Sequence, residues 1–275
     1  EAANDQSGYS VSLSSDGNTV AIGALYNDGN GNDSGQVRVF NYNGTDWMQL
    51  GSDLDGEAAS DYSGYSVSLS SDGTTLAISA RANNGNGSDS GHVRIYKFSG
   101  ITWTKLGSDI EGEAANDYLG SSVSLSSDGK IVAIGAILND GNGSDSGHVR
   151  VYNYDGTSWS QLGEDIDGEA SNDHFGFSVS LSSDGNTLAI SSPYNDGNGN
   201  SSGHVRIYNY NENVWSQLGS DIDGEAANDD SGYSVSLSSD GTTLAIGAPY
   251  NDDSGSTSGH VRIYSLIKIN KVPVA

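Results

Sequence analysis

Short alternations of apolar and polar residues recur along the chain, separated by stretches rich in Gly, Asn, Asp and Ser. In one window, Ser178–Ser182 alternates Val and Leu with Ser, Thr187–Ser191 follows, and His204–Tyr210 places Val and Ile on one face. A fourth apolar stretch begins at Trp215. A period of two bounded by turn residues is typical of strands, and no stretch keeps a period of 3.6 for ten residues. The window therefore predicts four short strands and no helix.

This window is one copy of a repeat of 56 residues. Asp184-Gly185, between its first two strands, is a hairpin signal, so the strands form an antiparallel meander. Repeats of this length with four antiparallel strands predict a β-propeller, here one all-β domain over residues 1–275 with five four-stranded blades. The spacing is kept by Gly8, Gly64, Gly120, Gly176 and Gly232, and the units are 1–56, 57–112, 113–168, 169–224 and 225–275.

The fifth unit is shorter than the others and has no Trp, so its blade is expected to be incomplete. No turn signal separates its third strand from residues 268–275. Either this tail folds back, with Pro273 restricting it to an edge, or the blade stays three-stranded. An exposed strand edge invites pairing with another chain, so a neighbouring subunit is an expected partner at this blade.

The repeat resembles the FG-GAP repeat of integrin α-subunit propellers and their relatives. Phe175-Gly176 followed by Ser178-Val179 matches one half of the motif, and Gly247-Ala248-Pro249 matches the other. The resemblance covers all five units and implies an extracellular propeller for adhesion or recognition. Calcium-binding members carry a long acidic loop between strands one and two, but here that loop is only Ser-Ser-Asp-Gly. One carboxylate cannot supply six to eight oxygens, so these aspartates are interpreted as turn residues: Asp16, Asp72, Asp128, Asp184 and Asp240.

The chain carries 36 acidic against 11 basic side chains, a formal net charge of −25. Such a charge repels nucleic acid and anionic membrane surfaces, so neither is an expected partner. There is no Cys, and no apolar stretch approaches the roughly 18 residues of a membrane helix, so membrane insertion is not expected either. The chain begins with Glu1 rather than Met, which favours a mature or excised piece of a longer protein.

Acidic residues gather in the loop between strands two and three and in the loop that joins one blade to the next. Both loops emerge on the same face of a meander, so that face should be strongly negative and attract cations. Carboxylate and amide oxygens suit calcium, the expected cofactor, although a solvated turn would use the same residues. The candidate metal ligands are Asp28, Asn30, Asn32, Asp33, Asp140, Asn142 and Asp145 in the first loop, and Asp53, Asp55, Glu57, Asp61, Asp165, Asp167, Glu169 and Asp173 in the second.

Three further residue types repeat with the blades. Histidines such as His92 are expected to bond a neighbouring backbone group or carboxylate, because equivalent positions of successive blades lie too far apart to share one ion. Arginines such as Arg94 should pair with a linking-loop carboxylate or a Tyr ring. The tryptophans should pack on their blade or, alternatively, offer a stacking surface to a sugar; they are Trp47, Trp103, Trp159 and Trp215.

No His-Glu-x-x-His or Gly-x-Ser-x-Gly motif is present, and the paired carboxylates are too repetitive to single out one catalytic pair. Five near-copies of one surface favour a non-enzymatic, secreted module that binds glycan or protein ligands multivalently. A structural unit of a surface filament, layer or large adhesin is the alternative, and an enzyme with an axial site is less favoured.

Overall fold

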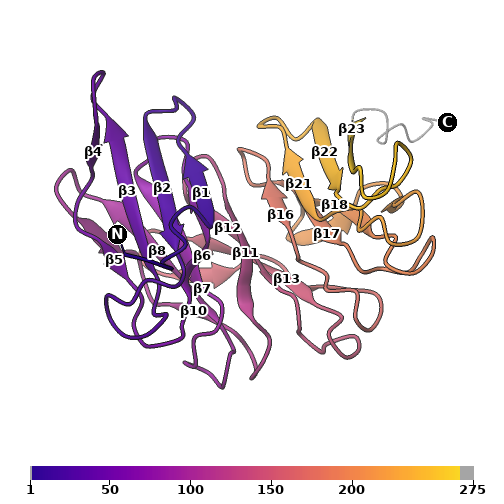
Figure 1. Ribbon diagram of the computed structural model, residues 1–275, viewed down its shortest axis with the longest axis horizontal. Coiled ribbons are helices and arrows are strands. Elements are labelled where there is room, and N and C mark those ends of the chain that lie inside the picture. The colour runs from indigo at the N-terminus through magenta and orange to yellow at the C-terminus, as the bar shows by residue number, and fades with distance from the viewer. Residues whose placement is uncertain (1, 267–275) are drawn as a thin grey trace.

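The computed structural model describes residues 2–266 and shows an all-β chain of five successive sheets, one for each repeat (Figure 1). The predicted tail over residues 268–275, with Pro273, lies outside the described residues. Within residues 2–266, no helix is long and apolar enough to cross a membrane.

Each blade begins with three antiparallel strands joined as a meander. The predicted ranges of the fourth unit agree with these strands to within one residue. The first strands are β1 Ser10–Leu13, β6 Ser63–Leu69, β11 Leu119–Leu125, β16 Val179–Leu181 and β21 Ser234–Leu237. The second strands are β2 Thr19–Ala24, β7 Thr75–Ala80, β12 Ile131–Ala136, β17 Thr187–Ser192 and β22 Thr243–Ala248. The third strands are β3 Gln36–Tyr42, β8 His92–Phe98, β13 His148–Tyr154, β18 His204–Asn211 and β23 His260–Ser265.

The outer strand of each complete blade is divided in two, where the sequence predicted one continuous strand. In the first blade, Tyr42 of β3 pairs with Trp47 and Val37 pairs with Leu54. Gly51, with φ of 80°, lies between the two pieces and turns the chain. The outer pieces are β4 Trp47–Gln49 and β5 Leu54–Asp55, β9 Trp103–Lys105 and β10 Ile110–Glu111, β14 Trp159–Gln161 and β15 Ile166–Asp167, and β19 Val214–Gln217 and β20 Ile222–Asp223. The fifth sheet has three strands within the described residues.

The hairpin between the first two strands has the predicted turn chemistry. Asp184 Oδ1 accepts hydrogen bonds from the Ser182 hydroxyl and the Asn186 amide, and Gly185 adopts a φ of 72°. These bonds hold the pKa of Asp184 below its usual range, against the opposing effect of burial. Since equivalent bonds form at Asp16, Asp72, Asp128 and Asp240, their assignment as turn residues is confirmed.

The hydrophobic core lies between blades. Val37 and Val39 of the first blade form one cluster with Val67 and Leu69 of the second. Three further clusters of the same kind join blades two and three, three and four, and four and five. Hydrogen bonds support this packing, because the Leu69 amide donates to the Ser12 hydroxyl across the blade boundary. Each blade is therefore stabilised by its neighbours as well as by its own sheet.

The arc of blades is open between the first and the fifth. Figure 1 shows the first strands of the blades near the middle of the view, with β1 and β21–β23 separated at its upper side. Val11 and Leu13 of β1 are 63% and 59% exposed, and Val261 and Ile263 of β23 are 67% and 73% exposed. Their equivalents are buried at the internal blade boundaries, except Val235, which is partly buried, so the described residues form an unclosed propeller.

Candidate functional site

The two acidic loops lie side by side, as the meander topology predicts. Asn30, in the loop between β2 and β3, donates its side-chain amide to the Gly56 carbonyl at 2.9 Å and to the Glu57 carbonyl at 3.2 Å. Asn142 makes the same contact with Gly168 two blades further on. The two loops therefore lie together on one face of the blades, which is the face predicted to be acidic.

Within the first of these loops, the candidate ligands also bond one another. Asp28 Oδ1 accepts the Asp33 amide at 2.9 Å, and the Asn32 side-chain amide donates to Asp33 Oδ2 at 2.7 Å. Asp140 accepts the Asp145 amide in the same way. One oxygen of Asp28 and one of Asp140 thus stabilise the turn, while both side chains remain exposed on the acidic face.

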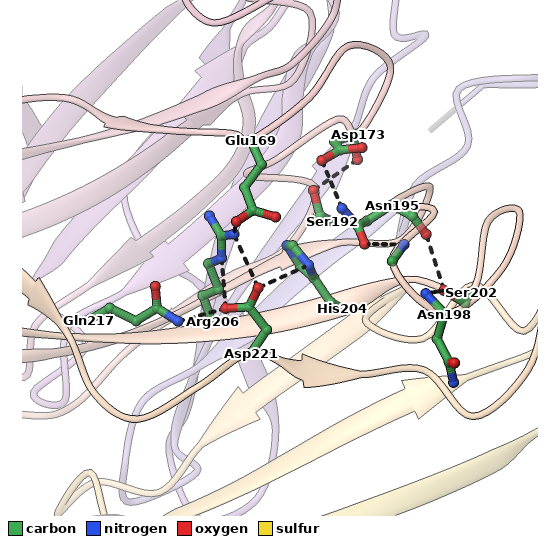
Figure 2. A network of polar contacts seen from close by, with 11 residues as sticks. Glu169, Asp173, Ser192, Asn195, Asn198, Ser202, His204, Arg206, Gln217 and Asp221 are labelled. Carbon is green, nitrogen blue, oxygen red and sulfur yellow. Dashed lines mark hydrogen bonds and ion pairs between the residues drawn. The ribbon is translucent and has the colours of Figure 1, made fainter.

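Two candidate ligands of the linking loop are buried instead. Asp61 Oδ2 accepts the Asn83 side-chain amide at 3.0 Å and the Ala58 amide at 3.1 Å. Figure 2 shows the equivalent Asp173, which accepts the Asn195 amide at 2.9 Å. In this structure both carboxylates connect the two loops internally and do not point to the acidic surface.

A different arrangement, which was missed from the sequence, brings histidine and carboxylate ligands together. At each boundary, one Glu of the incoming linking loop, one His that opens the third strand and one Asp lie with ligand atoms within 4.8 Å of one another. Each group could hold a metal ion. The groups are Glu57, His92 and Asp109; Glu113, His148 and Asp165; Glu169, His204 and Asp221; and Glu225, Asp253 and His260.

Three of the fifteen candidate metal ligands belong to these groups: Glu57, Asp165 and Glu169. The remaining carboxylates lie elsewhere in the loops. Among the described residues, no group of three His and carboxylate ligands includes Asp28, Asp33, Asp53, Asp55, Asp61, Asp140, Asp145, Asp167 or Asp173. In the first blade Gln36 replaces the histidine and donates to Asp53 and Asp55.

The histidines of the first three groups, His92, His148 and His204, are buried, and burial lowers the pKa of each. Burial lowers the pKa of His92 to about 4, and it also lowers the pKa of His148 to about 4; the neighbouring arginines act in the same direction. Nε2 of both rings is buried without a hydrogen-bond partner, as is Nε2 of His204. His148 Nδ1 lies 3.9 Å from Asp165, which makes the expected histidine–carboxylate pairing a long contact. A neutral imidazole beside two carboxylates suits zinc-like cations better than calcium, which prefers oxygen ligands alone.

An arginine side chain already pairs with at least one carboxylate of each group. Arg94 lies 3.3 Å from Glu57 and donates to the Asp55 carbonyl of the preceding blade at 3.0 Å. Figure 2 shows Arg206 between Glu169 and Asp221. Arg206 donates to Asp221 through Nε at 3.0 Å and through Nη2 at 3.1 Å, and it also pairs with Glu169. The predicted role of the arginines as links between blades is confirmed. A bound metal ion would compete with a guanidinium for the same oxygens.

A shallow pocket recurs beside these groups, between the linking loop of one blade and the tryptophan of the next. The larger pocket, of about 380 Å³, is lined by Asp165, Asp167, Tyr208 and Trp215. One blade earlier, a pocket of about 220 Å³ has the equivalent lining, with Trp159 and Tyr152 facing Asp109 and Glu111. An aromatic wall thus faces a row of carboxylates at two successive boundaries.

The tryptophans contribute to packing as well as to these pockets. The indole N–H of Trp103 donates to the Leu50 carbonyl at 2.8 Å, and Trp159 and Trp215 bond the preceding blade in the same way. Trp103 is buried, whereas Trp47 of the first blade is 47% exposed. This position therefore combines packing with solvent exposure, to a degree that differs from blade to blade.

Comparison with known proteins first gives the fold. A solved structure described as Kuenenia stuttgartiensis hydrazine synthase aligns with a TM-score of 0.56 and 15% sequence identity, over 87% of this chain and 61% of that one. The chain thus spans less than two thirds of this neighbour, and at such low identity the likeness concerns the fold alone. A search of curated proteins found no match.

The family model described as the FG-GAP repeat matches five segments, which are residues 1–40, 54–96, 111–152, 166–208 and 222–264. The matches keep the order and spacing of the blades, and each ends within or just after a third strand. Since they cover most of its length, the chain belongs to the FG-GAP repeat family.

Proposed function

We propose that this chain is a non-enzymatic, extracellular recognition module that binds glycans at the repeated pockets between blades. The observation that carries the proposal is the pairing of Trp215 with Asp165 and Asp167, and of Trp159 with Asp109 and Glu111. An aromatic ring can stack on the apolar face of a sugar, while carboxylates accept hydrogen bonds from its hydroxyl groups.

Repetition of the pocket supports a multivalent mode of binding. Two neighbouring sites on one rigid scaffold raise the effective concentration of a second sugar once the first is bound. Weak single contacts then give useful affinity for a polymer or a dense glycan surface. Non-enzymatic action accords with this repetition, since no boundary carries a unique pair of catalytic groups among the described residues.

A glycan array followed by calorimetry tests the pockets. Replacing Trp159 and Trp215 by Ala should weaken binding of a bivalent glycan more than tenfold. Trp47→Ala is the matched control and should change affinity less than twofold, because Trp47 has no preceding linking loop in the described residues. Absence of any glycan ligand, or equal losses in all variants, would refute the proposal, and binding of a protein ligand alone would replace it.

We further propose that calcium binds the exposed oxygens of the acidic face, with Asp28 and Asp140 among its ligands. The high local density of carboxylates supports this assignment, and oxygen ligands are the ones that calcium prefers. The His-containing groups would take a zinc-like ion instead. The two kinds of metal site thus differ in their ligand atoms: oxygen alone for calcium, and oxygen with an imidazole nitrogen for a zinc-like ion.

Thermal unfolding distinguishes these ions. EDTA should lower the melting temperature and calcium should restore it, since a ligand of the folded state stabilises that state. Asp28→Asn with Asp140→Asn should remove the calcium response, whereas His92→Gln with His148→Gln should leave it intact. If EDTA followed by calcium causes no shift, calcium has no place in the function.

A further inference from the structure

One of the four groups of histidine and carboxylate ligands differs from the others in the cations around it. This third-blade group consists of Glu113, His148 and Asp165, whose ligand atoms lie within 4.8 Å of one another. Among the residues that the structure describes, no lysine or arginine forms an ion pair with Asp165. Its Oδ1 accepts the side-chain amide of Gln161, which is neutral, at 2.6 Å. One carboxylate of this group therefore has no positive charge paired with it.

The equivalent aspartates of the two neighbouring blades are already paired with a cation. In the second blade, Lys105 Nζ donates to Asp109 Oδ1 at 2.7 Å. In the fourth blade, Arg206 donates to Asp221 at 3.0 and 3.1 Å. Arg206 also pairs with Glu169, so its guanidinium lies between both carboxylates (Figure 2). The protein thus provides a cation of its own for this aspartate in two of the three groups with a buried histidine.

Arg150, the arginine of the third blade, does not take over this role. Its Nη1 lies 3.2 Å from Glu113, and its Nη2 donates to the Glu111 carbonyl at 3.0 Å. Its Nε is buried without a hydrogen-bond partner, whereas Nε of Arg206 donates to the aspartate of its own group. The guanidinium of Arg150 therefore pairs with only one of the two carboxylates.

His148 faces the second carboxylate without forming a hydrogen bond to it. The residue is 1% exposed, and its Nε2 is buried without a hydrogen-bond partner. Its Nδ1 lies 3.9 Å from Asp165 Oδ2, which is too far for a hydrogen bond. Burial lowers the pKa of His148 to about 4, so the ring is neutral near pH 7 and can act as a ligand. Buried polar groups normally have a partner, and a cation between Nδ1 and Oδ2 would supply one.

The distances and the ligand atoms favour zinc or a similar transition metal. Zinc bonds to imidazole nitrogen and carboxylate oxygen are about 2.0–2.2 Å long, so two ligands of a tetrahedral ion lie about 3.4 Å apart. The distance of 3.9 Å between His148 and Asp165 is close to that value. The side chains of Glu113 and Asp165 are 47% and 30% exposed, which gives an ion access from solvent. Calcium requires six to eight oxygens, which this group does not offer.

We propose that the third-blade group is the principal zinc-class site of the chain, with three protein ligands and a fourth position for water. The groups of the second and fourth blades bind such an ion more weakly, because Lys105 and Arg206 pair with their carboxylates. The group of the fifth blade is more open to water, since the His260 side chain is 23% exposed. The inference rests on the division between calcium and zinc-like ions proposed above, and it does not depend on glycan binding.

Titration of the whole, tag-free chain with cobalt(II) and with zinc tests the proposal. The visible absorption of cobalt(II) reports its coordination, and calorimetry gives the affinity and stoichiometry of zinc. One site should be tighter than all others. His148→Gln, which copies Gln36 of the first blade, should weaken binding at that site roughly tenfold or more. Absence of zinc binding to the unaltered chain, or equal binding to His148→Gln, would overturn the proposal.

Exchange of one residue between blades provides matched variants. Gln161→Lys copies Lys105 and places an ammonium beside Asp165, so it should weaken zinc binding roughly tenfold or more. Lys105→Gln makes the reverse change in the second blade and should add a second tight site. Both positions are exposed, so both variants should fold. If either change has no such effect, the proposal is wrong, whereas the glycan array and the calcium response test the proposed function separately.

Discussion

The internal and terminal blades of this propeller have nearly the same sequence but different surroundings. Leu69 in the second blade and Leu13 in the first share the local pattern Ser-Val-Ser-Leu, yet Leu13 is 59% exposed and Leu69 is 7% exposed. Trp103 and Trp47 differ in the same direction. The contrast shows that a blade acquires much of its stability from the neighbour on each side, as in other repeat architectures.

The largest expected difference concerns the core between blades. Leu69→Ala should lower the free energy of unfolding by about 2–4 kcal/mol, because it removes buried methyl groups and leaves a cavity. Leu13→Ala should cost about 0.5 kcal/mol or less, as at an exposed position. Urea unfolding of the two variants measures the difference, and equal losses would show that the first blade is covered in solution.

Buried histidines should make the internal boundaries sensitive to acid. Burial lowers the pKa of His92 to about 4 in the folded protein, from an ordinary value of about 6.5. Between these values the unfolded chain binds more protons, so stability should fall as the pH drops from about 6.5 to 4, by up to roughly 3 kcal/mol for this residue. His92→Gln, which copies Gln36 of the first blade, should reduce the loss. An unchanged pH profile of stability in the variant would contradict this prediction.

The indole bonds should give a smaller difference. Trp103→Phe removes the hydrogen bond to the Leu50 carbonyl and part of a buried ring, so it should cost about 1–2 kcal/mol. Trp47→Phe should cost about 0.5 kcal/mol or less, because its ring is half exposed. Thermal unfolding by circular dichroism compares them, and a larger effect at Trp47 would contradict the proposed ranking.

The smallest expected difference lies in the hydroxyl bonds of the first strands. Ser68→Ala removes the acceptor for the Leu125 amide and should cost about 0.5–1.5 kcal/mol. Ser236→Ala, at the same position of the last blade, should be nearly neutral. Hydrogen exchange of the Leu125 amide provides a local measurement, since it should become faster in Ser68→Ala only.

Local structure was largely readable from the sequence. The alternation around Val179 and Leu181 gave the first strand, and Asp184-Gly185 gave the hairpin, because both depend on backbone preferences and nearest neighbours. The division of the outer strand at Gly51 was missed. A glycine at position 51 does not by itself reveal that the chain pairs with one end of β3 before the turn and with the other end after it.

The grouping of Glu169, His204 and Asp221 was also missed, although each residue repeats with the same step of 56. The sequence predicts only that equivalent histidines of different blades lie too far apart to share one ion. The structure instead joins one histidine to carboxylates of two linking loops, 35 residues before it and 17 residues after it. Such proximity depends on how the loops fold back over β18.

The sequence by itself determined the blade: its four-part strand pattern, its turns, its order of repetition and the face on which the acidic loops emerge. These follow from the period of two and from turn chemistry, which act within a few residues. Only the tertiary structure decided which copies of Val, Leu and Trp are covered, that the arc stays open, and which charges meet. Those outcomes depend on contacts between separate blades, and identical local sequences such as those around Leu13 and Leu69 carry no record of whether a neighbour is present.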